Sequence, residues 1–518
     1  MGTAAIVANV PRVHAATRPH AIATICRGRQ TTFAELDRRA NQVAHGLTDA
    51  GVAPGGRVAV LATNTDIFLE LLFGATKANR VLVPINARLA PAEIARIVND
   101  AGAEMLFVGE GFEETVERIR GDLSTVRAIV GLGEGSGYER YDRWRDRHAG
   151  FDPMRAIDAS DVVLQVYTSG TTGEPRGVQL TNDNLLSVLP DTLSQHGGWS
   201  DRDVNLVCLP LSHVGGSLWA LAGCYVGATT VILPEAVPAE IVRAIAQYRV
   251  TKTFLVPVLI RLLLQTPGVA EGDLSSLSLL VYGGSPISPE LLQAASASLT
   301  CDFGQMYGLT ETSGGITYLT PDDHRRGPSS RLTSCGRPLS RVELRIVDGA
   351  GRDLPVGAIG EIVCRSPQVM KGYWNRPDET AQAVRGGWLY TGDAGYVDTD
   401  GYLYIHDRLT DMIVTGGENV YPTEVERVLL AHPAVAEAAV IGVPDDTWGE
   451  AVKACVVCKA GMEVGAAELT AFAAERLARY KRPRSFDLLA ALPRNASGKV
   501  LRRELRARFW AAGRRQVN

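Results

Sequence analysis

The segment Tyr167-Thr-Ser-Gly-Thr-Thr-Gly-Glu-Pro-Arg-Gly177 follows an apolar run, residues 162–167, that is typical of a buried strand. Glycine allows a loop in which backbone N–H groups converge on an anion, and the hydroxyl side chains add further donors. Arg176 supplies a permanent positive charge. The spacing of a Walker A loop is absent, so the segment predicts a phosphate-binding turn of another kind. The candidate residues are Thr168, Ser169, Gly170, Thr171, Thr172, Gly173 and Arg176.

The sequence before and after this turn alternates between short apolar runs and helical patterns. Thr32 and Glu35 have the spacing of a capping box, and apolar residues follow at helical spacing as far as Gly51. Short strands are expected at residues 57–62, 81–85 and 105–108, with helices between them. Such alternation predicts parallel βαβ units, and it resumes after a polar linker and continues to about residue 308.

The residue pattern changes after residue 325, where short apolar segments alternate with glycine and proline turns. That pattern favours an antiparallel β subdomain, and another small α/β unit begins near residue 411. We therefore expect an α/β fold with a large N-terminal domain of parallel sheets, residues 1–407, whose β subdomain occupies roughly 325–407. A hinge at 408–411 and a small, mobile α+β domain at 412–518 complete the predicted organisation.

Composition describes an ordinary globular chain of 518 residues, 46% hydrophobic and 21% charged, with a net charge of −4. This balance excludes overall disorder and argues against a nucleic-acid partner. Basic residues gather near the end: residues 479–518 contain twelve Lys or Arg and two acidic residues. The basic end is either a solvated helix face or a surface that attracts a polyanionic small molecule.

One uncharged run, residues 204–234, is long enough to raise the question of a membrane span, since only His213 in it is ionisable. Glycines and prolines divide it, so we expect a strand at 205–209, a buried helix at 217–226 and a strand at 229–233. No secretory signal is seen at the N-terminus, and eight scattered cysteines do not form a disulfide framework. These features predict a cytoplasmic protein without a transmembrane segment.

Six further motifs follow in a fixed order. They are Leu209-Pro-Leu-Ser-His-Val214, Tyr307-Gly-Leu-Thr-Glu-Thr312, Tyr390-Thr-Gly-Asp-Ala-Gly395, Gly401-Tyr-Leu-Tyr-Ile-His-Asp-Arg408, Gly416-Gly-Glu-Asn-Val-Tyr-Pro422 and Pro493-Arg-Asn-Ala-Ser-Gly-Lys499. Together with the turn at 167–177, they make the chain resemble the adenylate-forming (ANL) superfamily from about residue 32 to residue 505. That superfamily includes acyl-CoA and aryl-CoA ligases, nonribosomal adenylation domains and luciferases. Its members join a carboxylate to the α-phosphate of ATP and then usually pass the acyl group to a thiol, releasing AMP.

The resemblance implies roles in binding ATP and in forming the adenylate. Thr310 would contact the α-phosphate, and Glu311 would bind Mg²⁺, for which a carboxylate is a suitable ligand. Lys499 would reach the acid carboxylate and the α-phosphate, where a compact cation offsets their repulsion. The nucleotide's ribose and base would be held by Asp393, Arg408, Tyr307, Gly283, Gly284 and Ser285.

The resemblance also implies where the acid and the thiol bind. His213 would lie beside the acyl carbon, although a buried core histidine is the alternative. Gly416, Gly417 and Trp448 would line the pantetheine tunnel for coenzyme A, with Trp448 as plain core the alternative. The candidate acyl pocket residues are Trp219, Gly215, Gly216, Val256, Met306 and Gly314, none of which is charged. They favour an acid with an apolar body, and leave long-chain, aryl, alicyclic and dicarboxylic acids open.

Two positions depart from the pattern of the superfamily. Arg176 stands where Lys is common, and Thr410 stands at the hinge where Asp or Lys is usual. Both residues bear on adenylation and on the balance between domain orientations. They suggest uneven half-reactions in which adenylation is the weaker, and in the extreme a protein that accepts an acyl-adenylate made elsewhere.

We therefore predict an AMP-forming acyl-CoA synthetase that uses ATP, Mg²⁺, coenzyme A and a small carboxylic acid. The first alternative is a protein that loads a separate carrier protein, and the second is a luciferase-like monooxygenase. A third is a membrane-recruited binding protein that uses its basic end with Phe509 and Trp510. The sequence leaves a homodimer open.

Overall fold

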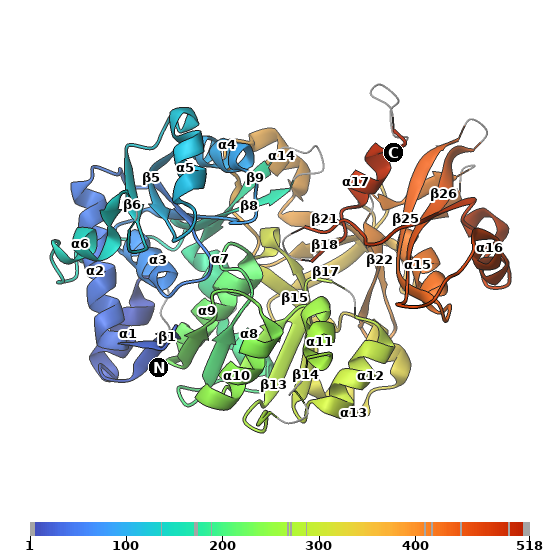
Figure 1. The fold of residues 1–518 in the computed structure, drawn as a ribbon, viewed down its shortest axis with the longest axis horizontal. Helices are drawn as coiled ribbons and strands as arrows, with labels where there is room; N and C mark the ends of the chain where they lie inside the picture. The colour runs from blue at the N-terminus through green and yellow to red at the C-terminus, as the bar shows by residue number, and fades with distance from the viewer. Residues whose placement is uncertain are drawn as a thin grey trace. The chain divides into compact units, whose positions relative to one another are not determined.

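The structure is a computed structural model of the chain. It describes residues 6–135, 137–169, 175–187, 189–266, 269, 272–285, 287–408, 411–415, 418–445, 448–495 and 498–510. The chain divides into two compact units (Figure 1). The first comprises Met1–Glu343 with Cys364–Leu389, and the second comprises Leu344–Val363 with Tyr390–Asn518. The domain boundary expected at 408–411 stays a prediction, and residues 409 and 410 lie outside the described residues.

An eight-stranded sheet in the first unit carries the predicted phosphate-binding segment. Its order is β19 (Gly372–Tyr373), β9 (Pro175–Thr181), β8 (Val162–Ser169), β4 (Val81–Ile85), β3 (Arg57–Leu61), β5 (Ala103–Val108), β6 (Ala128–Gly131) and β7 (Glu139–Arg140). Strands β8, β4, β3, β5, β6 and β7 run parallel, as the βαβ pattern predicts, whereas β9 and β19 are antiparallel to their neighbours. The helices between the parallel strands include α3 (Ile67–Lys77), α4 (Pro91–Ala101) and α5 (Glu113–Ile119).

Helix α2 (Phe33–Asp49) begins at the capping box that the sequence predicts. The backbone N–H of Thr32 donates to the Glu35 carboxylate at 2.8 Å, and the Thr32 hydroxyl accepts from the Glu35 N–H at 3.2 Å. The apolar stripe of the helix, with Leu36, Val43 and Leu47, is fully buried. Local capping and long-range burial therefore specify the same helix.

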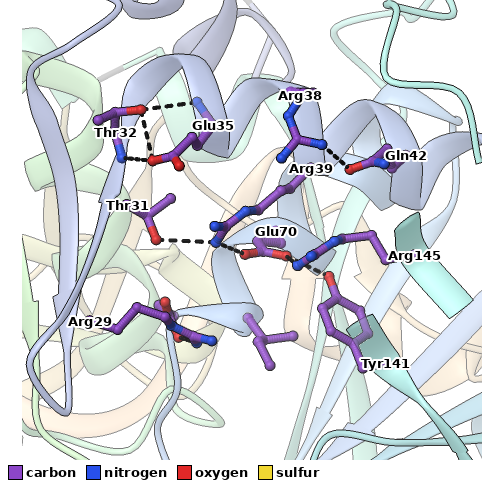
Figure 2. A network of polar contacts seen from close by, with 12 residues as sticks. Arg29, Thr31, Thr32, Glu35, Arg38, Arg39, Gln42, Glu70, Tyr141 and Arg145 are labelled. Carbon is purple, nitrogen blue, oxygen red and sulfur yellow. Dashed lines mark hydrogen bonds and ion pairs between the residues drawn. The ribbon is translucent and has the colours of Figure 1, made fainter. Parts of the chain in front are cut away.

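A buried carboxylate ties α2 to α3 and to α6 (Tyr141–Asp146), as Figure 2 shows. Glu70 of α3 is 2% exposed and accepts hydrogen bonds from Arg39 at 3.1 Å, Arg145 at 3.0 Å and the Tyr141 hydroxyl at 2.8 Å. These charge-assisted bonds offset the cost of burying the carboxylate.

A nine-stranded sheet forms the other half of the first unit. Its order is β16 (Arg337–Pro338), β15 (Gly314–Leu319), β14 (Asp302–Leu309), β13 (Leu279–Gly283), β12 (Lys252–Leu255), β10 (Val204–Val207), β11 (Thr229–Ile232), β1 (Ile22–Cys26) and β2 (Arg29–Thr32). The six strands from β14 to β1 run parallel. The remaining helices of the unit are α1 (Asn9–Thr17), α7 (Asn182–Leu186), α8 (Leu189–Gln195), α9 (Val214–Val226), α10 (Pro238–Tyr248), α11 (Pro257–Leu264), α12 (Pro289–Ser298), α13 (Pro321–Arg326) and α14 (Pro377–Ala383).

The long uncharged run folds as β10, α9 and β11, which confirms the expected strand, helix and strand. Most residues of α9 are buried between the sheet and the rest of the core, which explains the lack of charge. Among the described residues, we find no helix with the length and apolar character needed to cross a membrane.

Two further five-stranded sheets supply the strands of the second unit, although β20 and the ends of β18 and β21 lie in the segment Cys364–Leu389 of the first unit. One comprises β17 (Glu343–Val347), β18 (Gly360–Arg365), β21 (Trp388–Val397), β20 (Val384–Arg385) and β22 (Leu403–Arg408), in accord with the antiparallel segments expected from the sequence. The other comprises β24 (Glu418–Val420), β23 (Ile413–Thr415), β26 (Gly449–Cys458), β25 (Val435–Asp445) and β27 (Ser485–Leu488). Helices α15 (Pro422–Leu430) and α16 (Ala466–Ala474) share its buried core, and α17 (Arg502–Ala507) follows (Figure 1). The mixed α/β fold class is thus confirmed.

Candidate active site

Four predicted site segments follow neighbouring parallel strands of the nine-stranded sheet. His213 follows β10, Val256 follows β12, Gly283 ends β13 and Thr310 follows β14. The carboxyl ends of parallel strands meet at one edge of a sheet, where ligands bind in open α/β folds. The fold therefore brings candidates for nucleotide and acid binding to one edge.

Thr310 and Glu311 lie in a short 3₁₀ turn, Thr310–Thr312, directly after β14. The Glu311 carboxylate accepts a hydrogen bond from the Tyr373 hydroxyl at 2.9 Å, and the Glu311 carbonyl accepts from the Met370 N–H at 2.8 Å. Burial, together with the Glu311 charge, raises the pKa of Tyr373, so the phenol stays protonated and donates. A carboxylate fixed in this way suits Mg²⁺, which usually binds one or two protein carboxylates together with phosphate oxygens.

The glycines at the end of β13 leave backbone space next to Tyr307. Gly283 pairs with Met306 across β13 and β14, and a Cβ on Gly283 would clash with the Met306 carbonyl oxygen. Gly284 has φ +78°, a conformation that side chains rarely adopt, and Ser285 follows it exposed. The arrangement places Tyr307 and a narrow glycine segment on adjacent strands, as a base-binding site requires.

Strands β8 and β9 form a hairpin around the phosphate-binding segment, in which Thr168 pairs with Arg176 and Ser169 with Pro175. The predicted strand at 162–167 is confirmed and extends to Ser169. Gly170, Thr171, Thr172 and Gly173 lie outside the described residues.

Arg176 makes an ion pair with Glu379 of α14, and its guanidinium carbon lies 5.4 Å from the ring centroid of Tyr373. The residue that replaces the usual lysine is therefore close to the tyrosine that holds Glu311. Glu379 and Tyr373 both come from the segment 371–379, which the sequence analysis did not single out. The sequence feature that could have identified this segment is its high density of aromatic and charged residues, Lys371-Gly-Tyr-Trp-Asn-Arg-Pro-Asp-Glu379.

The same segment anchors the other strand of the hairpin. Asp100 of α4 accepts hydrogen bonds from the Tyr167 hydroxyl at 2.6 Å and from Arg376 at 2.9 Å. The indole of Trp374 donates to the Asp100 carbonyl at 3.0 Å. Burial, with the nearby Asp100 carboxylate, raises the pKa of Tyr167. Both strands that lead into the phosphate-binding turn are thus held by side chains far away in sequence.

His213 caps the N-terminus of α9, with its backbone in an extended conformation. Its Nε2 atom is buried and has no hydrogen-bond partner among the described residues. Burial and, to a smaller extent, the charge of Arg88 lower the pKa of His213, so the ring is neutral. A satisfied core histidine would have a partner for this nitrogen, so the geometry favours a role in ligand binding.

The candidate acyl-pocket residues differ in burial and in the room that the surrounding atoms leave for a side chain. Trp219 is buried on α9, and its ring lies 5.7 Å from that of Phe254. A Cβ on Gly216 would clash with the Pro210 carbonyl oxygen, so close backbone packing explains this glycine. A Cβ on Gly215 would lie 3.0 Å from the Phe254 ring, and Gly314 has φ +107°. Val256 caps α11, and Met306 lies in β14.

In the second unit, Asp393 and Arg408 are direct partners across β21 and β22. Asp393 is 4% exposed, and its backbone N–H donates to the Thr391 hydroxyl at 3.1 Å. The residue expected to hold ribose is therefore buried, and its backbone lies directly opposite that of Arg408. Thr410 lies outside the described residues.

Lys499 lies in a tight turn whose two ends are hydrogen-bonded to each other. The Lys499 N–H donates to the Asn495 side chain at 2.8 Å, and the Asn495 N–H donates to the Lys499 carbonyl at 2.8 Å. Gly498 has φ +81°, which explains the glycine in the Gly-Lys pair. The Lys499 side chain is exposed.

Trp448, a candidate for the coenzyme A tunnel, is 44% exposed, so it is not a core residue. The guanidinium carbon of Arg484 lies 4.9 Å from its ring centroid, and this residue was not singled out from the sequence. Of the basic residues nearby, Lys481 is paired with Glu424 at 2.7 Å and Arg482 donates to the Leu477 carbonyl. Gly416 and Gly417 lie outside the described residues.

The candidate residues for nucleotide and acid binding thus gather at the carboxyl edge of a parallel sheet, which is where enzymes with open α/β folds bind their ligands. The model of the AMP-binding enzyme family matches residues 12–374, and the model of the AMP-binding enzyme C-terminal domain matches residues 424–499. The chain belongs to this adenylate-forming family of acyl ligases.

Proteins similar over almost the whole chain include ligases with different thiol acceptors. The fatty acid–[acyl-carrier-protein] ligase ScoC of Streptomyces coeruleorubidus is 41% identical over 98% of this chain and 96% of its own length. The feruloyl-CoA synthase of an Amycolatopsis species is 40% identical over 95% of this chain and 96% of its own. Among solved structures, the amide bond synthetase McbA of Marinactinospora thermotolerans has a TM-score of 0.88 and 33% identity, covering 98% of this chain and 100% of that one.

Proposed function

We propose that the protein is an acid–thiol ligase that activates an apolar carboxylic acid as an acyl-adenylate with ATP and then transfers the acyl group to coenzyme A. The observation that carries this proposal is the oriented carboxylate of Glu311, which is held by Tyr373 next to Thr310 and near Arg176. A phosphate hairpin, a metal-binding carboxylate and a base-binding strand end are the parts that adenylation needs.

In the first half-reaction, the acid carboxylate attacks the α-phosphorus of ATP and pyrophosphate leaves. Thr310 donates to an α-phosphate oxygen, and the hairpin with Arg176 holds the departing phosphates. Lys499 brings the two anions together, which is the main requirement of a reaction governed by positioning and charge. Mg²⁺ bound by Glu311 would neutralise phosphate charge.

The second unit holds the nucleoside while the acyl group reacts. Asp393 accepts from the ribose hydroxyls, and Arg408, which is its partner in the backbone register of β21 and β22, is the proposed basic partner for the ribose or phosphate. The hydrogen bond from the Asp393 N–H to the Thr391 hydroxyl fixes the backbone that carries this carboxylate.

In the second half-reaction, the thiol attacks the acyl carbon and AMP leaves. Neutral His213 orients the acyl group through its buried Nε2. The exposed indole of Trp448 offers a surface for the pantetheine chain, and Arg484 and Arg479 are exposed near the end of the chain, where they suit the phosphates of coenzyme A. These features support free coenzyme A as the acceptor.

A carrier-protein thiol is the second candidate acceptor. It is favoured by the 41% identity to a fatty acid–[acyl-carrier-protein] ligase over almost the whole chain. The first half-reaction is the same in both cases, so the two candidates differ only in the thiol.

The test is to incubate the protein with ATP, Mg²⁺ and a panel of long-chain, aryl, alicyclic and dicarboxylic acids. Each acid is offered with coenzyme A, with a phosphopantetheinylated carrier protein or with a simple amine, and products are identified by mass spectrometry. The proposal expects acyl-CoA and AMP as the main products. A preference for the carrier protein would select the second candidate, and an amide as main product would contradict both.

A further inference from the structure

Four aromatic side chains in the first unit carry polar atoms that have no hydrogen-bond partner among the described residues. These atoms are both ring nitrogens of His196, the Nε1 atoms of Trp199 and Trp219, and the hydroxyl of Tyr318. His196, Trp219 and Tyr318 are only 2%, 7% and 3% exposed. Buried polar atoms in proteins nearly always have partners, so several such atoms in one place indicate a missing ligand or water.

The four side chains and Phe254 form two groups of ring contacts that are joined through the chain segment after α8, and together we call them the aromatic cluster. The ring centroids of His196 and Tyr318 are 4.2 Å apart, and those of Trp199 and Trp219 are 4.8 Å apart in an edge-to-face contact. Trp219 also contacts Phe254, at 5.7 Å between centroids. His196 and Trp199 lie on the short segment after α8, which links the two pairs of rings.

The aromatic cluster is connected to the elements that carry the proposed reaction centre. Trp219 is six positions after His213 on α9, which corresponds to about 9 Å along the helix axis. Tyr318 of β15 is the cross-strand partner of Met306 in β14, the strand that ends at Thr310. A small acid with its carboxylate beside His213 would therefore place its far end near the cluster.

The chemistry of the cluster favours a neutral group that accepts hydrogen bonds. Indole N–H groups can only donate, whereas a neutral histidine offers one donor and one acceptor. Burial lowers the pKa of His196 to about 3, so the ring carries no charge near neutrality. The cluster thus offers at least three donors and no charge of its own, and Lys252, whose charge also lowers the pKa of His196, makes an ion pair with Asp203. A second carboxylate is therefore disfavoured, because its desolvation would be poorly compensated.

We propose that the acid activated by this protein carries a neutral hydrogen-bond acceptor, such as an ether, methoxy or carbonyl oxygen, at the end remote from its carboxylate. Trp219 and Trp199 are the specificity-determining residues that donate to this oxygen. The inference rests on the proposed acid-activating function and narrows its substrate class. A site built to hydrogen-bond a substrate rejects the analogue that lacks the polar group, since its own donors then stay unpaired.

Matched pairs of acids test this proposal through the rate of pyrophosphate release. One pair is para-methoxycinnamic and para-ethylcinnamic acid, and the other is an alkanoic acid and its analogue with one ether oxygen near the far end. The full-length protein is expected to prefer the oxygen-bearing acid of at least one pair by about tenfold to a hundredfold in kcat/KM. In Trp219→Phe, which keeps the ring but lacks the N–H, that ratio should fall to about threefold or less.

Trp199→Phe repeats the test if Trp219→Phe does not fold, and Trp144→Phe is the matched control. Trp144 packs against Phe107 and Tyr141, so its substitution should leave the ratio unchanged. Equal kcat/KM within both pairs, or a ratio unaffected by both cluster variants, would overturn the inference and indicate that water satisfies the donors. Failure to adenylate any acid would instead contradict the proposed function.

Discussion

Single side chains in this protein act through partners that are distant in sequence. Glu311 was identified from its motif, whereas Tyr373, which donates to its carboxylate, lies 62 positions later and carries no motif of its own in the sequence analysis. The hydrogen bond orients the carboxylate before any ligand binds. Preorganisation of this kind reduces the ordering that must occur during the reaction.

Tyr373→Phe should therefore slow adenylation more than it affects binding of the acid. Loss of one hydrogen bond to a charged group corresponds to a rate decrease of about tenfold or somewhat more. The measurement is single-turnover formation of acyl-adenylate, with thioester formation from supplied adenylate as the internal reference. An equal decrease in both half-reactions would contradict the orienting role.

Burial of His196 leads to a prediction of how the free energy of unfolding depends on pH. Because burial lowers its pKa to about 3, the unfolded chain binds a proton that the folded chain does not bind between that pH and about 6.5. The free energy of unfolding should decrease as pH falls below about 6.5, by up to about 1.4 kcal/mol per pH unit from this residue.

Urea unfolding near neutral and near pH ~5 measures this effect. The loss of stability between the two conditions should be smaller in His196→Phe than in the natural protein. His20→Phe, at an exposed position, should leave the loss unchanged. An identical loss in all three proteins would show that His196 is not buried in its neutral form.

At the scale of elements, the sequence predicts local structure well and side-chain partners poorly. Thr32 and Glu35 specify the start of α2, and the uncharged run resolves into β10, α9 and β11 because periodicity and turn residues are local signals. The contact between Asp100 and Arg376, separated by 276 positions, arises only when α4 packs against the start of α14. Gly216 shows the same limit, since its close approach to the Pro210 carbonyl is set by tertiary geometry.

Substitution of Glu70 tests how much the buried polar network of α3 contributes to the free energy of unfolding. Glu70→Ala removes the acceptor of three donors in the network of Figure 2 and leaves Arg39 and Arg145 largely buried without it. We expect a loss of about 3–5 kcal/mol, typical of breaking a buried ion pair. The exposed pair of Glu240 and Arg243 is the control, since Glu240→Ala should cost less than about 1 kcal/mol. Similar urea midpoints for both variants would contradict the structural role of Glu70.

The ion pair on the hairpin of β8 and β9 leads to a prediction of how the KM for ATP changes in a variant. Because Arg176 is paired with Glu379, incoming phosphates must compete with this carboxylate for the guanidinium group. Glu379→Gln should therefore lower the KM for ATP several-fold, while thioester formation from a supplied adenylate stays unchanged. A higher KM for ATP would indicate that Glu379 instead positions Arg176 productively. The result bears directly on the hypothesis that adenylation is the weaker half-reaction.

At the scale of the whole molecule, the candidate site residues are distributed over both compact units. Thr310, Glu311, His213 and the phosphate hairpin belong to the first unit, whereas Asp393, Arg408 and Lys499 belong to the second. From the sequence, the domain boundary is expected at residues 408–411, which groups Asp393 with Thr310 and Glu311 in the large domain, and that boundary stays a prediction. The roles of all these residues stay predictions, and Gly416, Gly417 and Thr410 in addition lie outside the described residues.

Lys499 is expected to serve only one of the two half-reactions. In Lys499→Ala, acyl-adenylate formation should fall by at least about a hundredfold, because the proposed contact with the carboxylate and the α-phosphate loses its cation. Thioester formation from a supplied acyl-adenylate should persist near the rate of the natural protein. Equal loss of both half-reactions in a folded variant would contradict this assignment.

The most direct measurement of the central claim is mass spectrometry of the products formed from ATP and an accepted acid, with and without coenzyme A. Without thiol, the protein should accumulate enzyme-bound acyl-adenylate and release pyrophosphate; with coenzyme A, it should yield acyl-CoA and AMP in equal amounts. Formation of ADP and phosphate, or of a thioester without AMP, would contradict an adenylate-forming ligase acting at this site.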